Sequence, residues 1–131
     1  MRPKWTRYVA MGIALLLAFV MLVSLVVPIW VCEAAMKHCI LAKYRPEVYP
    51  RRQELLPRIR QIFSAASELE GVSGASVYPN CVARDNRYDV LIVLDMAPEA
   101  LPVYDASAMH HLWKEEFGPL LAQKAIFDFE A

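Results

Sequence analysis

Tyr88-Asp89-Val90-Leu91-Ile92-Val93-Leu94 is the stretch that decides the fold. A short run this rich in apolar and β-branched residues predicts a β-strand. Because side chains of a strand point alternately to opposite faces, Val90, Ile92 and Leu94 share one face. Leu91 and Val93 lie on the other, so both faces are apolar. A sheet built around this strand therefore needs a covering layer on each side.

Three further strands are predicted around this stretch from alternating patterns and from the turn residues that bound them. Pro79 interrupts one of them, which we therefore place at the edge of the sheet. We expect strands at residues 37–44, 75–84 and 124–130, and we extend the central strand to residues 87–96.

Two helical regions alternate with these strands. Apolar residues recur at helical spacing over residues 51–70 and predict an amphipathic helix. Pro98 opens a second helical region that reaches Phe117, and Asp105 or Ser107 caps its later part. The order strand, helix, strand, strand, helix, strand predicts an α+β domain of ferredoxin-like βαββαβ type.

Two helices can cover only one face of a four-stranded sheet. The second face of the central strand is nevertheless apolar, and large exposed apolar patches indicate an interaction surface. We therefore expect a homodimer, in which two sheets face each other and form a dimeric α/β-barrel.

The N-terminal segment has a different character, since no charged residue occurs between Arg7 and Glu33. This length suits a transmembrane helix, which needs about 20 apolar residues. We expect residues 1–35 to be a single-pass membrane anchor, spanning at residues 9–32, with the domain at residues 36–131. A cleaved signal peptide is one alternative. The other is a start of translation at Met36, which would make the protein cytoplasmic.

Composition narrows the functional classes. The net charge is zero, which argues against nucleic-acid binding. Cys32, Cys39 and Cys81 are an odd number at irregular spacing, so we expect buried free thiols instead of a disulfide framework or a zinc site. His38, His110, His111 and Asp128 form no known metal-binding motif, and we expect neither a metal nor a cofactor.

Four segments, taken in order, carry a family resemblance. They are Met36-Lys37-His38-Cys39-Ile40-Leu41, then Tyr88 to Val93, then Tyr104 with His110 six positions later, then Ile126-Phe127-Asp128-Phe129-Glu130. Together they resemble the stress-responsive dimeric α/β-barrel (Dabb) family, which includes olivetolic acid cyclase-like proteins. The resemblance covers residues 36–131. It implies a homodimer with a cavity between sheet and helices in each protomer, and a stress-related role.

The resemblance also implies a site. In the cyclase-like members a tyrosine and a histidine at this spacing perform an aldol cyclisation, which makes Tyr104 and His110 the candidate catalytic pair. His110 would act as general base, and Tyr104 would polarise a carbonyl. We expect one of His110 and His111 to point inward. The expected ligand-binding residues are His38, Ile40, Val90, Ile92 and Asp128.

A structural interpretation stands beside each of these roles. Tyr104 and His110 could instead form a polar pair that fixes a helix to the sheet. His38 could be a hydrogen-bonded core residue, and since the first and last strands are neighbours in this fold, a contact between His38 and Asp128 is expected either way.

Three functions remain. The first is a binding module for a small apolar or aromatic molecule. The second is a cyclase-like or lyase-like enzyme that uses Tyr104 and His110. The third is a membrane-tethered dimerisation scaffold. We place the binding module first, because a shared fold alone does not establish a reaction.

Overall fold

The computed structural model describes residues 5–26 and 35–130 of the 131-residue chain. The chain divides into two compact units, Met1–Cys32 and Glu33–Ala131. In the first unit the structure describes one helix, α1 (Trp5–Val26).

The expected membrane anchor is not supported. Within the described ranges 5–26 and 35–130, no helix is both long enough and apolar enough to cross a membrane. The described residues of helix α1 include the polar Thr6 and Arg7 near its start. Residues 27–34 of the expected segment lie outside the described residues.

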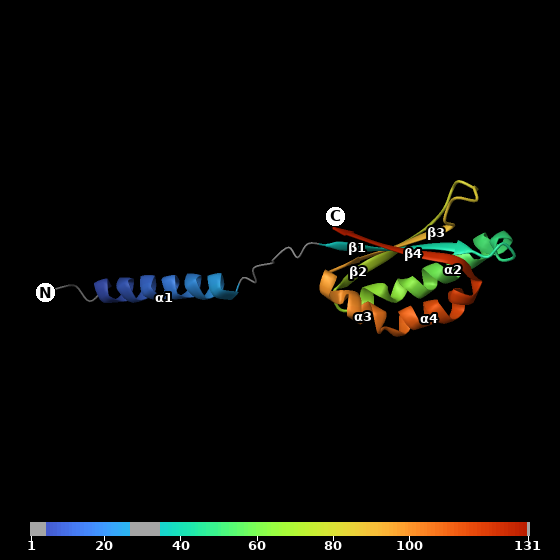
Figure 1. Cartoon of the computed structure of the whole chain (residues 1–131). Helices are drawn as coiled ribbons and strands as arrows, with labels where there is room; N and C mark the ends of the chain where they lie inside the picture. Colours follow the sequence, from blue (N-terminus) through green and yellow to red (C-terminus); the bar gives the residue numbers. More distant parts are fainter. Residues whose placement is uncertain (1–4, 27–34, 131) are drawn as a thin grey trace. The chain divides into compact units, whose positions relative to one another are not determined.

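The second unit alternates strands with helices, as the sequence predicts (Figure 1). The main elements are β1 (Met36–Tyr44), α2 (Arg52–Phe63), β2 (Val72–Pro79), β3 (Val90–Met96), α3 (Leu101–Asp105), α4 (Ala108–Phe117) and β4 (Leu121–Glu130). Short 3-10 turns join them: η1 (Tyr49–Arg51), η2 (Ser64–Glu68), η3 (Pro98–Ala100) and η4 (Gly118–Leu120).

The strands form an antiparallel four-stranded sheet in the order β2-β3-β1-β4. Strand β1 lies inside the sheet, with Ile40 opposite Ile92 of β3 on one side and opposite Ile126 of β4 on the other. Strand β2 is an edge strand, as the position of Pro79 predicts. This order and the alternating helices confirm the predicted ferredoxin-like fold.

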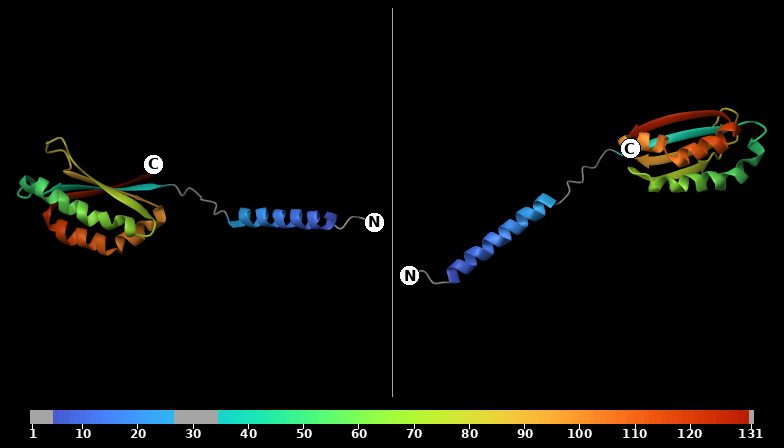
Figure 2. Two further views of the ribbon diagram at one scale, coloured as in Figure 1. Left: turned by 180° about the vertical axis from the view of Figure 1, so that it is seen from behind. Right: turned by 90° about the horizontal axis from the view of Figure 1, so that it is seen from below.

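The helices cover one face of the sheet (Figures 1 and 2). Ile40, Ile92 and Leu94 point into this covered face and are at most 2% exposed. Apolar residues of α2 and α4 complete the core, among them Ile59, Phe63, Trp113 and Phe117. Burial of these side chains provides the main stabilisation of the unit.

The opposite face, which we call the open face, is also apolar. Leu91 and Val93 of β3 lie there and are only half-buried. Phe127 of β4 is 61% exposed, Phe129 is 42% exposed and Tyr78 of β2 is 54% exposed. The Phe127 and Phe129 rings contact each other, with centroids 6.0 Å apart. The predicted apolar character of both faces is therefore confirmed.

Several predicted boundaries are wrong. Strand β2 covers Val72–Pro79 instead of residues 75–84. Its last ladder pair is Pro79 with Val90, and after one more backbone hydrogen bond, from the Asn80 amide to the Asp89 carbonyl, the chain forms the β2–β3 loop. Strand β4 begins at Leu121, where η4 ends. The expectation of buried thiols holds for Cys39 but is wrong for Cys81, which lies in the exposed β2–β3 loop. Cys32 lies outside the described residues.

Candidate functional site

The pairing of β1 with β4 brings His38 and Asp128 together. These residues are direct partners in the antiparallel ladder, so their side chains leave the same face. The His38 Nδ1 atom lies 2.5 Å from Oδ1 of Asp128. His38 is buried, whereas the Asp128 side chain is partly exposed. The predicted contact between these two residues is confirmed.

Tyr104 lies in α3 and His110 in α4, and hydrogen bonds at the junction of these helices hold the two residues in position. Ser107 is the N-cap of α4, and its Oγ accepts a hydrogen bond from the His110 amide at 3.1 Å. The same hydroxyl donates to the Tyr104 carbonyl at 2.7 Å. His110 Nδ1 donates to the Asp105 carbonyl at 2.9 Å, so Nε2 is the ring nitrogen left for another partner.

Three aromatic rings then form a row. The Tyr104 ring centroid lies 5.3 Å from that of His38 and 4.6 Å from that of His110. His111 is exposed, so of the two neighbouring histidines His110 is the one that points inward. We call Asp128, His38, Tyr104 and His110 the Tyr104 cluster. The fold brings together all four polar residues that were expected to be catalytic or ligand-binding.

The Tyr104 hydroxyl is the unusual atom of this cluster. Tyr104 is 1% exposed, and its hydroxyl has no hydrogen-bond partner among the described residues. Burial, followed by the nearby Asp105 carboxylate, raises the pKa of Tyr104 well above its ordinary value. The phenol is therefore protonated at neutral pH and can donate a hydrogen bond.

The three apolar candidates lie on the same face of the sheet as His38. Ile40, Val90 and Ile92 are buried and belong to one continuous hydrophobic cluster with the helices. Ile40 is opposite Ile92, and Val90 is opposite Ala42, farther along the same face of the sheet.

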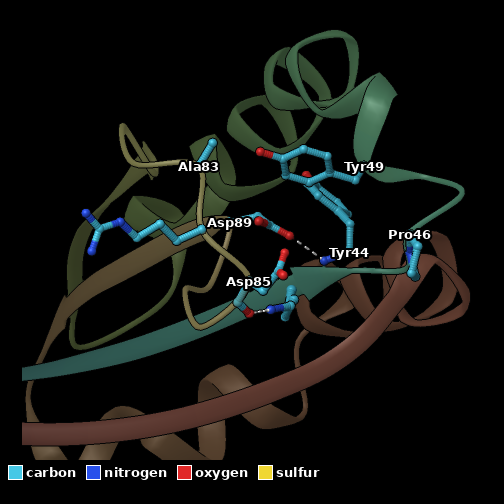
Figure 3. A pocket seen from close by; sticks show the side chains of 8 residues that line it. Tyr44, Pro46, Tyr49, Ala83, Asp85 and Asp89 are labelled. Atoms are coloured by element: carbon cyan, nitrogen blue, oxygen red, sulfur yellow. Dashed lines mark hydrogen bonds between the residues drawn. The ribbon is translucent and has the colours of Figure 1, made fainter.

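An open pocket lies elsewhere, beneath the β2–β3 loop (Figure 3). It has a volume of about 330 Å³, and Tyr44, Tyr49 and Asp89 form part of its wall. We call it the loop pocket. The sequence interpretation missed these residues, although Tyr44 ends the face that starts with His38, and Asp89 directly precedes β3.

Asp89 shapes this pocket because it forms hydrogen bonds with β1 just beyond the last ladder pair of β1 and β3. Its amide donates to the Ala42 carbonyl at 2.8 Å, and its Oδ2 accepts from the Tyr44 amide at 2.8 Å. The Lys43 ammonium donates to the Asp85 carbonyl and so holds the loop against β1 (Figure 3).

Comparisons with known proteins identify the fold. No family model and no curated protein matches the chain. A dimeric ferredoxin-like protein of unknown function from Thermobifida fusca superposes with a TM-score of 0.62 and 17% identity, over 74% of this chain and 91% of that one. A dimeric protein of unknown function with a ferredoxin-like fold from Bacteroides fragilis superposes with a TM-score of 0.64 and 13% identity, over 76% of this chain and 98% of that one.

A third solved structure bears on the family resemblance. It is a Dabb family protein with a ferredoxin-like fold from Mesorhizobium loti, with a TM-score of 0.58 and 14% identity, over 74% of this chain and 96% of that one. At this identity the likeness concerns the fold alone. Residues 36–130 thus have a ferredoxin-like fold, as this Dabb family protein does.

Proposed function

We propose that this chain is a homodimeric α/β-barrel protein that binds a small apolar or aromatic molecule, with a polar group of that molecule beside the Tyr104 cluster. The observation that supports a ligand is the Tyr104 hydroxyl, which is buried and has no hydrogen-bond partner in the described part of the chain. A buried donor left unpaired costs about 1–3 kcal/mol. A ligand oxygen at this point would recover that energy.

The surroundings of the hydroxyl fit such a ligand. Two imidazoles flank the Tyr104 ring, and Asp128 anchors one of them. His110 is only half-buried and gives the cluster a side that faces solvent. A molecule entering past His110 would meet aromatic faces first and the phenol last, which favours an aromatic or apolar body with one acceptor.

The open face supports the homodimer. Exposed Phe127, Phe129 and Tyr78 flank the half-buried Leu91 and Val93, so the apolar surface extends from one edge strand to the other. A second copy that covers this face would form the barrel, and the solved structures from Thermobifida fusca and Bacteroides fragilis are described as dimeric. An isologous pairing of this kind buries the same patch on both protomers.

Native mass spectrometry of the full chain, purified from its own source, tests the proposal. We expect a dimer that carries a discrete additional mass for each protomer. Tyr104→Phe should lose that mass, because the substitution removes one oxygen and keeps the ring. Tyr78→Phe is the control and should keep the additional mass, because Tyr78 is exposed on the open face and belongs to neither the cluster nor its lining. An adduct that survives Tyr104→Phe, or a dimer without adduct, would contradict ligand binding at the cluster.

An enzyme is the second candidate, and the contact of Tyr104 with His110 favours it. The protonated phenol could stabilise negative charge on a carbonyl oxygen, while Nε2 of His110 removes a proton from the neighbouring carbon. A β-polyketide substrate should then be cyclised by the wild-type chain, with a loss of at least about 100-fold in His110→Ala. Equal turnover by His111→Ala is the expected control, because His111 is exposed.

A further inference from the structure

The loop pocket contains the second buried phenol of the domain. Its cavity of about 330 Å³ adjoins another of about 480 Å³, and the two share Tyr49, Ala83 and Asp89. Small-molecule sites have volumes of this size. The loop pocket shares no lining residue with the Tyr104 cluster.

Tyr44 lines this cavity and carries an unsatisfied hydrogen-bond donor. The residue is 3% exposed, and its hydroxyl has no partner within the described residues. Buried polar groups in proteins are nearly always hydrogen-bonded, so the hydroxyl calls for an acceptor that the chain itself does not provide. Burial and, to a lesser extent, the Asp89 carboxylate raise the pKa of Tyr44 to about 12, which keeps the hydroxyl protonated.

Asp89 presents the complementary group. Its Oδ2 accepts from the Tyr44 amide, which leaves Oδ1 for a donor from a ligand. Lys43 does not neutralise it in this structure, because its ammonium is bonded to the Asp85 carbonyl. A ligand that reaches both Tyr44 and Asp89 must therefore carry an acceptor and a donor.

The remaining wall favours a flat, uncharged body. Tyr49, Pro46 and Ala83 contribute apolar surface. The charged lining residues are two cations, Lys43 and Arg84, and two carboxylates, Asp85 and Asp89, so the pocket has no excess charge to attract an ion.

We infer that the loop pocket binds a small neutral aromatic compound that accepts a hydrogen bond from the Tyr44 hydroxyl and donates one to the Asp89 carboxylate. The inference is independent of the ligand proposed at the Tyr104 cluster, since it uses a different cavity and a different phenol.

Titration of the ¹⁵N-labelled full chain with 4-hydroxybenzamide, which carries both groups on one ring, tests this inference. We expect saturable shifts of the Tyr44 and Asp89 amide signals, and a binding constant at least about tenfold weaker in Tyr44→Phe, because this variant loses one buried hydrogen bond. Toluene, with the same ring and no polar group, should bind the wild type more weakly and should not distinguish it from Tyr44→Phe. Tyr104→Phe should retain the shifts of the Tyr44 and Asp89 amide signals, because Tyr104 does not line the loop pocket.

Three outcomes would overturn the inference. They are no saturable shift at millimolar 4-hydroxybenzamide, equal binding of the two probes by the wild type, and shifts that Tyr104→Phe abolishes while Tyr44→Phe retains them. Circular dichroism of Tyr44→Phe establishes that the variant is folded, and Asp89→Asn gives a second measurement, with an expected loss of affinity for 4-hydroxybenzamide but not for toluene.

Discussion

The two faces of the sheet have the same apolar composition but different surroundings. On the covered face, Ile92 of β3 is fully buried beneath α2 and α4, and on the open face its neighbours Leu91 and Val93 are only half-buried. The chain thus supplies one of the two covers that β3 needs. The difference shows that the strand pattern specifies how many layers pack on a sheet but not whether they come from the same chain.

The covered face should tolerate truncation least. Ile92→Ala removes methyl groups from a fully buried position and leaves a cavity, so the free energy of unfolding should fall by about 3 kcal/mol. Urea unfolding followed by circular dichroism measures this change. Because the lost contacts lie within one protomer, the decrease should be the same at every protein concentration. A loss below about 1 kcal/mol would contradict the packing of this face.

The open face should respond through assembly. Leu91→Lys places a charge on the open face, within the proposed interface, where it would be poorly solvated, but leaves the covered core intact. We expect the unfolding midpoint of the wild type to rise with protein concentration and that of Leu91→Lys to be independent of it. Ser73→Lys, an exposed position of β2, is the control and should retain the concentration dependence. The same midpoint at all concentrations for the wild type would count against pairing through this face.

The buried phenols of the covered face should lose their protons only at a pH above the ordinary pKa of tyrosine. The pKa of Tyr44 is raised to about 12, whereas tyrosine in an unfolded chain has a pKa near about 10. This difference stabilises the fold below pH of about 10, and the contribution is lost as the pH rises from there to about 12. Absorbance at alkaline pH should show a step near pH 12 that Tyr44→Phe removes and Tyr78→Phe, on the open face, retains. Persistence of that step in Tyr44→Phe would contradict the burial of this ring.

The smallest effect concerns an ion pair at the surface of the covering layer. Arg58 of α2 donates to Glu116 of α4, and this hydrogen bond lowers the pKa of Glu116. A lowered carboxyl pKa stabilises the fold above the ordinary glutamate value, and the contribution disappears as the pH falls through the folded value. Glu116→Gln should therefore reduce the acid dependence of unfolding only slightly, since both side chains are partly exposed. A change as large as that of Ile92→Ala would contradict this assignment.

The fold could be predicted because each element leaves a local signal. Alternation along Val90 to Leu94 defines the two faces, and the turn residues separate the strands. The start of β2 could not be predicted, because a register shift between Val72 and Gly74 extends its pairing with β3 beyond the apolar pattern. Of the two predicted caps of α4, only Ser107 has the extended backbone of an N-cap, a distinction that the residue types alone do not make.

The candidate site likewise has a part that could be predicted from the sequence and a part that could not. The contact of His38 with Asp128 follows from the neighbouring positions of the first and last strands, and it was predicted. The loop pocket was missed because the contact of Asp89 with the Tyr44 amide depends on where the ladder of β1 and β3 ends and on the path of the β2–β3 loop. Loop paths depend on non-local contacts, for example that of Lys43 with Asp85, which sequence spacing does not show.

Sedimentation equilibrium of the full chain tests the proposed pairing of open faces most directly. Since one chain has a mass of 14.9 kDa, the wild type at micromolar concentration should sediment as a particle of twice this mass, and Leu91→Lys as a single chain. A wild type that sediments as a single chain, or a Leu91→Lys variant that keeps the mass of the dimer, would contradict the proposal.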